Sequence, residues 1–342
     1  MSAINTQTIF PFTAIVGQEE MKSALLLNAV DAGIGGVLIM GHRGTAKSTA
    51  VRSLAALLPP MAQQPLIAEV TLQGEKSEIP LYPTAKNDAN APQSVPIVDL
   101  PLSATEDRVV GTLDIEVALS QGKKAFEPGL LARAHGGFLY IDEVNLLEDH
   151  LVDLLLDVAA SSINVVEREG LSVRHPAQFV LVGSGNPEEG DLRPQLLDRF
   201  GLYTQIVTIV DVRQRMEVVR RSEAFRERPG EFLREWQPRQ AALREKITRA
   251  REILPSVEVP DSLLQRAVKL CVKLRIDGHR GEITLTRAAR SHAALEGRKK
   301  VNSSDFRRVA EISLRHRLRR DPLEDIDSGE KIRDAMQGLF VG

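Results

Sequence analysis

The chain contains 342 residues, of which 43% are hydrophobic and 4% aromatic, so it can form one large or two ordinary domains with a buried core, and we expect two. Lys and Arg number 44 and Asp and Glu 46, which excludes a whole-molecule field that attracts nucleic acid or an anionic membrane. The single cysteine, Cys271, excludes an internal disulfide and predicts a buried thiol in an intracellular protein.

The N-terminal residues contain no basic stretch followed by a long apolar segment, and the apolar run at 24–30 is too short to cross a bilayer. We therefore expect a soluble protein that contacts neither membrane nor nucleic acid. Its expected location is the cytoplasm, or the stroma if it comes from a plastid.

Short apolar runs alternate with helical patterns in the first part of the chain. Each run is too short for a helix and too uniformly apolar for a half-exposed strand, so we predict buried parallel strands. Helical spacing of three and four lies between them, in 51–58 and 147–158. This alternation predicts an α/β fold, a parallel sheet with helices on both faces, over residues 1–211. The predicted strands are 37–40, 138–141, 179–182 and 206–210.

The strands end near residue 211, and residues 212–342 are predicted to be helical. A highly charged connector comes first, with helix breaks expected at Pro229 and Pro238. An all-helical C-terminal domain follows, in which Asn302 is expected to cap a helix. Residues 74–96, rich in Pro, Asn and Ser, are predicted to form a mobile surface loop.

Residues 41–48 read GHRGTAKS and join a predicted strand to a predicted helix. They match the phosphate-binding pattern G-x-x-x-x-G-K-[ST] except at Ala46, and in this context backbone N–H groups converge on one anion. Lys47 is expected to reach the β and γ phosphates and Ser48 to ligate Mg²⁺. The alternative is a relic loop in which the Ala46 methyl blocks the phosphate. The predicted nucleotide-binding residues of this segment are Gly41, His42, Arg43, Gly44, Thr45, Ala46, Lys47, Ser48 and Thr49.

Polar residues at the ends of two later strands favour a working loop. Asp142 could hold the magnesium through water, and Glu143 could polarise the attacking water. Asn186 could sit beside the γ phosphate, although an Asn-Pro turn is the simpler interpretation. Arg199 follows a short predicted helix.

At this point the chain resembles the AAA+ ATPases, with Walker A at 41–48, Walker B at 138–143, sensor 1 at Asn186 and an arginine finger at Arg199. The resemblance implies a ring, most simply a hexamer, in which each finger completes the neighbour's ATP site. It also implies a sensor 2 arginine at Arg280, with Arg287 and Arg290 as rivals. Val16, Gly17 and Gln18 would lie nearest the adenine.

The blocks FPFTAIVGQEEMK, DLPLSATEDRVVGTLDIE, VEREGLSVRHPAQFVLVGSGNPEEG and LRPQLLDRFGL resemble the family of magnesium chelatase I subunits, almost end to end. Residues 104–137 resemble the helix-2 insert of that AAA+ clade, and 163–179 a hairpin before sensor 1. The resemblance implies a subunit of a ligase that forms nitrogen–metal bonds, an ATP-driven motor working with a D subunit and a porphyrin-binding H subunit. The complex inserts Mg²⁺ into protoporphyrin IX for chlorophyll or bacteriochlorophyll.

The phosphate loop departs from this family, which usually has Asp and Gly where this chain has His42 and Ala46. The departure leaves a cobaltochelatase motor open, and a MoxR-type chaperone is a further alternative. An MCM-type helicase is another alternative, in which the basic run 315–320 would bind DNA. The slight excess of acidic over basic residues in the chain argues against it.

Metal in this chain is expected to be only the Mg²⁺ of Mg-ATP. The acidic segment 323–329 is of the type that the D subunit's integrin-like domain would bind. Seven histidines are scattered without the spacing of a ligand set: His42, His135, His150, His175, His279, His292 and His316.

Overall fold

The computed structural model describes residues 8–58, 66–72, 75–81, 95–113, 126–168, 171–190, 192–318 and 328–340. They belong to two compact units. The first unit contains Met1–Asp31, Ile39–Pro59 and Tyr203–Gly342, and the second contains Ala32–Leu38 and Pro60–Leu202. The expected domain limits at residues 211 and 212 stay a prediction.

A five-stranded sheet has the order β11-β1-β10-β7-β4. Strands β10 and β4 both pair with β7 in parallel, with Val180 and Ile97 opposite Phe138. All four residues of β7 and all six of β10 are buried, as continuous apolar runs in a covered parallel sheet require. The predicted α/β class is confirmed. The strand bounds are β1 Val37–Gly41, β4 Ile97–Leu100, β7 Phe138–Ile141, β10 Val180–Gly185 and β11 Leu202–Ile206.

The fourth predicted strand, 206–210, is wrong in position. Strand β11 ends at Ile206, and the side chains of Val207 and Val210 are 70% and 86% exposed. As the first strand in the sheet order, β11 needs to bury only alternate residues, and it buries Leu202, Thr204 and Ile206. The uniformly apolar run that suggested the strand lies just beyond it.

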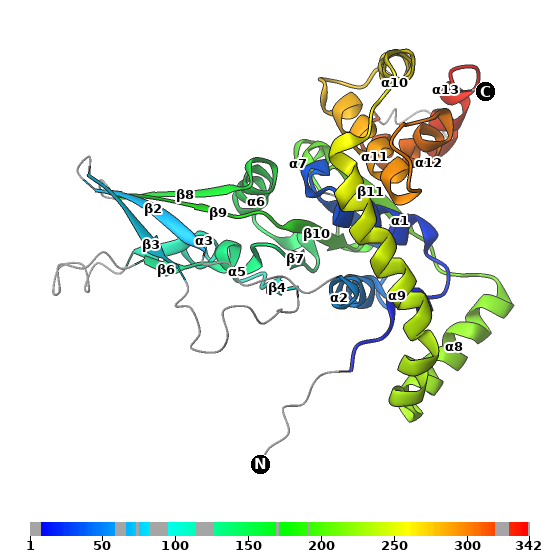
Figure 1. Ribbon diagram of the computed structural model, residues 1–342, viewed down its shortest axis with the longest axis horizontal. Helices are drawn as coiled ribbons and strands as arrows, with labels where there is room; N and C mark the ends of the chain where they lie inside the picture. The colour runs from blue at the N-terminus through cyan, green and yellow to red at the C-terminus, as the bar shows by residue number, and fades with distance from the viewer. Residues whose placement is uncertain are drawn as a thin grey trace. The chain divides into compact units, whose positions relative to one another are not determined.

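Two long helices, α8 (Val212–Glu227) and α9 (Pro229–Ile253), form the charged connector of the first unit (Figure 1). The break at Pro229 is confirmed, because Pro229 begins α9. The break at Pro238 is wrong, because α9 continues through it. Around the proline, α9 is held by an aromatic cluster in which Phe232 packs on Trp236, with ring centroids 5.9 Å apart. Packing of this kind outweighs the one backbone hydrogen bond that a proline removes.

Trp236 also lies between two cations of the connector. The guanidinium groups of Arg221 and Arg239 stand 4.6 and 4.5 Å from its ring centroid. Arg221 donates in addition to the Ala14 carbonyl at 3.0 Å. These contacts tie the N-terminal segment to α8 and α9 within the first unit.

The C-terminal helices confirm the predicted all-helical region. Helix α12 begins with a capping box in which Asn302 and Asp305 bond each other's backbone N–H. Burial alone would raise the pKa of Asp305, but hydrogen bonds from His292 and Arg298 outweigh it and lower that pKa to about 2. Cys271 is buried as predicted, and burial raises the pKa of its thiol to about 12. The helices are α10 Asp261–Lys273, α11 Arg280–Leu295, α12 Ser303–Leu314 and α13 Ser328–Met336.

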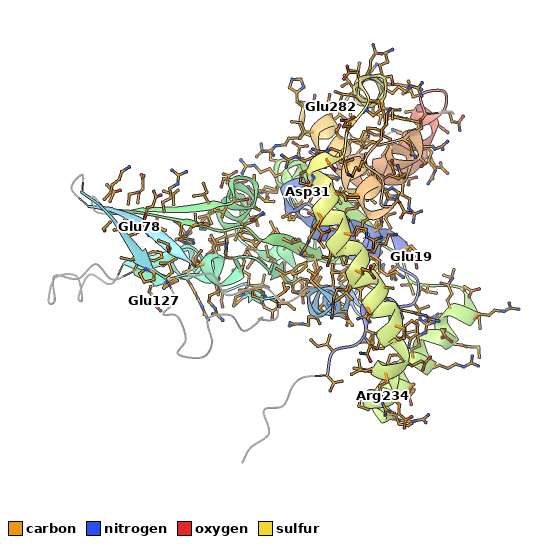
Figure 2. The ribbon with its side chains drawn as sticks, viewed as in Figure 1. Glu19, Asp31, Glu78, Glu127, Arg234 and Glu282 are labelled. Carbon is orange, nitrogen blue, oxygen red and sulfur yellow. The ribbon has the colours of Figure 1, made fainter. Side chains whose placement is uncertain are left out.

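The second unit carries an antiparallel sheet of order β3-β2-β9-β8 (Figure 1). Strands β8 and β9 form the hairpin predicted at 163–179. The expected loop at 74–96 is wrong for 75–80, which pair with β2 as β3, and Glu78 lies on that strand (Figure 2). Residues 82–94 of that expected loop lie outside the described residues. The bounds are β2 Ile67–Leu72, β3 Glu75–Pro80, β8 Ile163–Arg168 and β9 Leu171–Pro176.

Buried polar contacts attach this sheet to the described part of the expected insert. Asn164 donates to the Val110 carbonyl at 2.8 Å and lies 3.0 Å from His175 Nε2. Burial lowers the pKa of His175, because desolvation disfavours the charged imidazolium. Within 104–137 lie α3 Glu106–Val110, α5 Leu130–Ala134, and the paired strands β5 Gly111–Leu113 and β6 Phe126–Pro128.

Candidate functional site

The phosphate loop lies in the first unit, between β1 and helix α2 (Lys47–Leu57). Gly41 is buried against β11, where a Cβ atom would come within 2.8 Å of Ile206 Cβ. Gly44 has a φ of 77°, which favours glycine, and the Thr45 hydroxyl donates to the His42 carbonyl at 2.8 Å. The loop is therefore a tight, internally bonded turn whose shape depends on its two glycines.

Ala46 occupies the position before α2 in the left-handed conformation, with φ 65° and ψ 25°. No side chain caps the helix, and its first turn, which includes Ser48 and Thr49, contains no acidic residue. An N-terminus of this kind keeps its backbone N–H groups and its positive dipole end for an anion. Ala46, which stands where the motif has glycine, thus has a backbone conformation that favours glycine.

Replacing Ala46 with glycine is expected to stabilise the chain by about 1 kcal/mol, because a left-handed alanine carries a Cβ clash that glycine lacks. Nucleotide affinity is expected to rise as well. Urea denaturation and nucleotide titration measure the two effects.

The matched control is Ala56→Gly, at an exposed position inside the same helix. That change is expected to destabilise the chain by about 1 kcal/mol, because there glycine only loosens the helix. Destabilisation by both glycines would contradict the strain assigned to Ala46.

Lys47 is folded back over the loop. Its ammonium donates to the Gly41 carbonyl and lies 3.4 Å from the His42 carbonyl. The cation is therefore held above the turn by backbone oxygens, at the helix end whose amides attract an anion.

The segment predicted to frame the adenine, Val16 to Gln18, lies against the residues that follow β11. Gly17 and Gln18 have φ values of 63° and 55°, and Gln18 Nε2 lies 3.5 Å from the Val207 carbonyl. A Cβ on Gly17 would lie 3.2 Å from Ile209 Cδ1. The first unit thus brings this segment together with the residues between β11 and α8.

The second unit holds the strand-end acids. Asp142 follows β7, and its Oδ1 accepts hydrogen bonds from Tyr140 Oη at 3.1 Å and from Ser184 Oγ at 2.5 Å. Glu143 comes next with a φ of 55°, so the backbone turns sharply between the acids and the short helix η3 (Val144–Leu146). Tyr140 and Ser184 are not among the predicted site residues, although they are polar residues inside apolar strands, two positions before Asp142 and Asn186, which is a usable signal.

Asn186 directly follows β10 and is 5% exposed. Its Oδ1 accepts the Glu188 N–H at 3.2 Å and so caps the short helix η4 (Pro187–Glu189). The turn interpretation and the sensor interpretation are compatible, because the cap fixes the amide at the strand end and leaves its nitrogen a donor.

Arg199 ends helix α7 (Pro194–Arg199) and pairs with two carboxylates of helix α6 (Asp149–Ser161). Its Nη1 lies 3.0 Å from Asp153 Oδ1 and 2.9 Å from Asp157 Oδ1. The two aspartates are four residues apart and share one helix face. Both contacts use one guanidinium nitrogen of a side chain that is 30% exposed, and neither aspartate is among the predicted site residues.

Of the three sensor 2 candidates, Arg280 begins α11 as predicted and is exposed. Arg287 is exposed on the same helix. Arg290 donates to the Val257 and Leu254 carbonyls, each at 3.1 Å, which makes it a structural clamp after α9. These two bonds attach α11 to the residues that follow α9, and the choice of sensor 2 arginine stays a prediction.

The described residues of the basic run, 315–318, supply interior contacts rather than an open cationic face. Arg315 pairs with Glu20 and Glu311, and Arg317 is 8% exposed and donates to the Ser313 carbonyl. Burial raises the pKa of Glu20, and Arg315 works against that shift. The described arginines of this run do not support a helicase.

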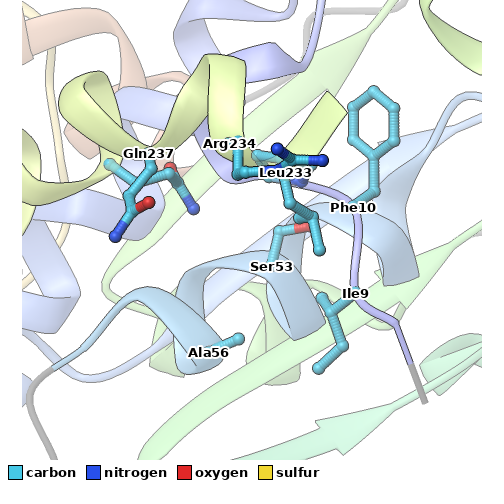
Figure 3. Close-up of a pocket in the computed structure, with 9 residues that line it drawn as sticks. Ile9, Phe10, Ser53, Ala56, Leu233, Arg234 and Gln237 are labelled. Atoms are coloured by element: carbon cyan, nitrogen blue, oxygen red, sulfur yellow. The ribbon is translucent and has the colours of Figure 1, made fainter. Parts of the chain in front are cut away.

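A cavity of about 240 Å³ lies in the first unit between the N-terminal segment, α2 and α9 (Figure 3). Ser53 and Ala56 line it from α2, and Arg234 and Gln237 from α9. None of the residues that line this cavity belongs to 41–48, so it is separate from the phosphate loop.

The described residues contain neither a metal-binding cluster nor a membrane-spanning helix. Among the described residues, no three His, Cys, Asp or Glu side chains gather as a metal site would require. In the same part of the chain, no helix has the length and apolar character of a membrane span. The acidic segment 323–329 lies almost wholly outside the described residues.

Residues 11–195 match the family model for magnesium chelatase, subunit ChlI, and residues 264–335 match an AAA lid domain. The chain belongs to the ChlI family of magnesium chelatase subunits. It is 58% identical to the magnesium-chelatase 38 kDa subunit of Acidiphilium rubrum, over 97% of each chain. It is 53% identical to subunit ChlI of a Nostoc species, over 98% of this chain and 91% of that one.

Solved structures support the same assignment for the fold. A chain in a cryo-EM complex of the magnesium chelatase subunits BchI and BchD is 56% identical, with a TM-score of 0.54 over 95% of this ChlI-family chain and all of that one. A crystal structure from Cytophaga hutchinsonii has a TM-score of 0.64 at 19% identity and bears on the fold alone. The AAA+ family to which these chains belong uses a nucleotide and Mg²⁺.

Proposed function

We propose that this protein is the ATP-hydrolysing motor subunit of a magnesium chelatase. It works as a ring of identical subunits together with a D subunit and a porphyrin-binding H subunit, in the cytoplasm or stroma, and drives Mg²⁺ into protoporphyrin IX. Membership of the ChlI family supports the pathway, and the BchI–BchD complex supports the D partner.

The geometry of the phosphate loop is the main support for assigning ATPase activity. A left-handed Ala46 opens an uncapped helix of 11 residues with no acid in its first turn, and Lys47 is held over the turn by two carbonyls. These groups fit a triphosphate, because backbone N–H donors, a helix dipole and an ammonium all favour an anion at one place. The same groups would repel a cation, so the loop suits the phosphates and not the metal alone.

Each remaining residue of the proposed site has one task. Ser48 and Asp142 hold the Mg²⁺ of Mg-ATP, whose charge offsets the charge that develops on the phosphates. Glu143 orients and polarises the attacking water, and Asn186 donates to it or to the γ phosphate. Arg199 acts on the nucleotide of a neighbouring subunit, and Arg280 contacts the phosphates from the lid.

Reconstitution tests the chelatase assignment. The purified chain is mixed with candidate D and H subunits, protoporphyrin IX, Mg²⁺ and ATP, and porphyrin fluorescence is followed. We expect the magnesium porphyrin to form only when all three subunits and ATP are present. Omitting this chain is the control for spontaneous insertion.

Two other outcomes of this reconstitution would instead assign the chain to another branch of the AAA+ clade. Absence of a magnesium porphyrin, with a cobalt product formed from Co²⁺ and cobaltochelatase partners, would show a cobaltochelatase motor. ATP hydrolysis without either product would favour a MoxR-type chaperone.

A further inference from the structure

Two hydroxyl side chains from neighbouring strands contact the same oxygen of Asp142. Tyr140 lies on β7 and Ser184 on β10, and the parallel register places Gly183 opposite Ile141. Ser184 therefore stands beside Asp142, one position further along each strand. Tyr140 points to the same side of the sheet as Asp142, because residues two apart share a face. All three residues belong to the second unit.

The three oxygens form a closed set. Ser184 Oγ donates to Asp142 Oδ1 at 2.5 Å, Tyr140 Oη lies 3.1 Å from that oxygen, and Tyr140 Oη lies 3.0 Å from Ser184 Oγ. Two hydroxyl protons serve three short contacts, so one arrangement is a relay in which Tyr140 donates to Ser184 while Ser184 donates to the carboxylate. Hydrogen bonds to a charged acceptor are stronger than neutral ones.

Burial distinguishes the hydroxyls from the carboxylate. Ser184 is 0% exposed and Tyr140 4% exposed, whereas Asp142 is an exposed residue. The two hydroxyls therefore approach from the protein interior and fix one carboxylate oxygen, Oδ1. The orientation of the other oxygen, Oδ2, follows from that attachment, because a carboxylate is planar.

We infer that Tyr140 and Ser184 are positioning residues for Asp142, the proposed holder of the magnesium of Mg-ATP: they bond its Oδ1 and so orient its carboxylate. They act through Asp142 and contact neither metal nor nucleotide in this role. The inference rests on the proposed ATP site and adds to it a part that the phosphate-binding motif does not contain. Outer residues that orient a metal ligand are a general feature of metal sites.

The test separates metal-dependent from metal-independent nucleotide binding. Full-length protein and the variants Tyr140→Phe, Ser184→Ala and the double variant are titrated with a fluorescent N-methylanthraniloyl ATP. Each titration is done in EDTA and again at rising Mg²⁺. Tyr203→Phe, on β11, and Ser313→Ala, on α12, are the matched controls for losing a tyrosine or a buried serine hydroxyl.

We expect the half-saturating Mg²⁺ concentration to rise roughly tenfold in Ser184→Ala and less in Tyr140→Phe, because a lost outer contact weakens metal binding on that order. Binding in EDTA is expected to stay within about twofold of the unaltered protein, since the loop residues are intact. The double variant should lose less than the sum of both, as a relay predicts. The control variants should match the unaltered protein.

Two results would overturn the inference: an unchanged Mg²⁺ requirement in both single variants, or an equal loss with and without Mg²⁺, which indicates a merely structural role. If Ser184→Ala lowers the melting temperature, the Mg²⁺ requirement of Tyr140→Phe tests the inference instead, because that change keeps the ring and removes only one oxygen. If the unaltered protein and Lys47→Ala bind the probe equally, the proposed ATP site itself is wrong, and the inference falls with it.

Discussion

Replacing Lys47 with alanine is expected to abolish measurable ATP hydrolysis, a loss of roughly 10³-fold, because the change removes a preorganised cation from the phosphate loop. The lysine also binds the ground state, so nucleotide affinity is expected to fall together with turnover. Its ammonium already lies over the Gly41 and His42 carbonyls. Phosphate release and nucleotide titration measure the two effects.

The control is Lys246→Ala on α9, which removes a surface ion pair with Glu296. An exposed pair of this kind contributes little to stability, so that variant should hydrolyse ATP as the unaltered protein does. Turnover by Lys47→Ala at the control's rate would remove the phosphate loop from the proposed site, and with it the proposed motor function.

The chemical parts of the candidate site could be predicted from the sequence because each is a local pattern at the end of a strand. A loop that joins a strand to a helix places Lys47 at the helix start whatever else the chain does. Asp142 and Asn186 follow β7 and β10 directly, and the structure shows them at those strand ends. Backbone geometry of this kind depends on a few neighbouring residues.

The partners of these residues could not be predicted in the same way. Ser184 reaches Asp142 only because β10 pairs with β7 in one register, and the two residues are 42 positions apart. Asp153 and Asp157 reach Arg199 through the packing of α6 against α7, at a similar separation. A sequence pattern within one segment cannot predict contacts between residues so far apart in the chain.

The errors in the fold have the same origin. The strand predicted at 206–210 rests on an apolar run alone. The run does not reveal that β11 lies at the edge of the sheet and buries only alternate residues. The break expected at Pro238 ignored the contacts of Trp236, which hold α9 together across the proline. Tertiary packing decided both cases against the local preference.

Replacing Arg199 with alanine is expected to lower ATP hydrolysis by roughly 10³-fold or more while leaving nucleotide affinity almost unchanged. The proposed role of Arg199 is to stabilise charge in the transition state of a neighbour's site, and a group that acts there affects turnover more than binding. The variant thus differs from Lys47→Ala, which should lose both. Phosphate release and nucleotide titration on the assembled protein separate the two patterns.

A structural explanation must be excluded, because Arg199 also joins α7 to α6 through Asp153 and Asp157. Arg193→Ala is the matched control, since Arg193, the residue before α7, also pairs with an aspartate of α6, Asp149, at 2.5 Å. These pairs lie at the surface and are partly open to solvent, so each is worth about 1 kcal/mol or less and neither variant should unfold. Loss of turnover in Arg199→Ala alone would point to a role beyond attaching the helices.

Mixing two inactive variants tests the shared site directly. Arg199→Ala subunits keep an intact phosphate loop, and Lys47→Ala subunits keep an intact finger. If the finger acts across a subunit boundary, mixed rings contain some sites with both parts, and hydrolysis should partly recover. If Arg199 acts on its own subunit's nucleotide, or only holds α7 in place, no mixed ring contains a complete site. A mixture that stays inactive while both variants assemble would therefore overturn the shared site.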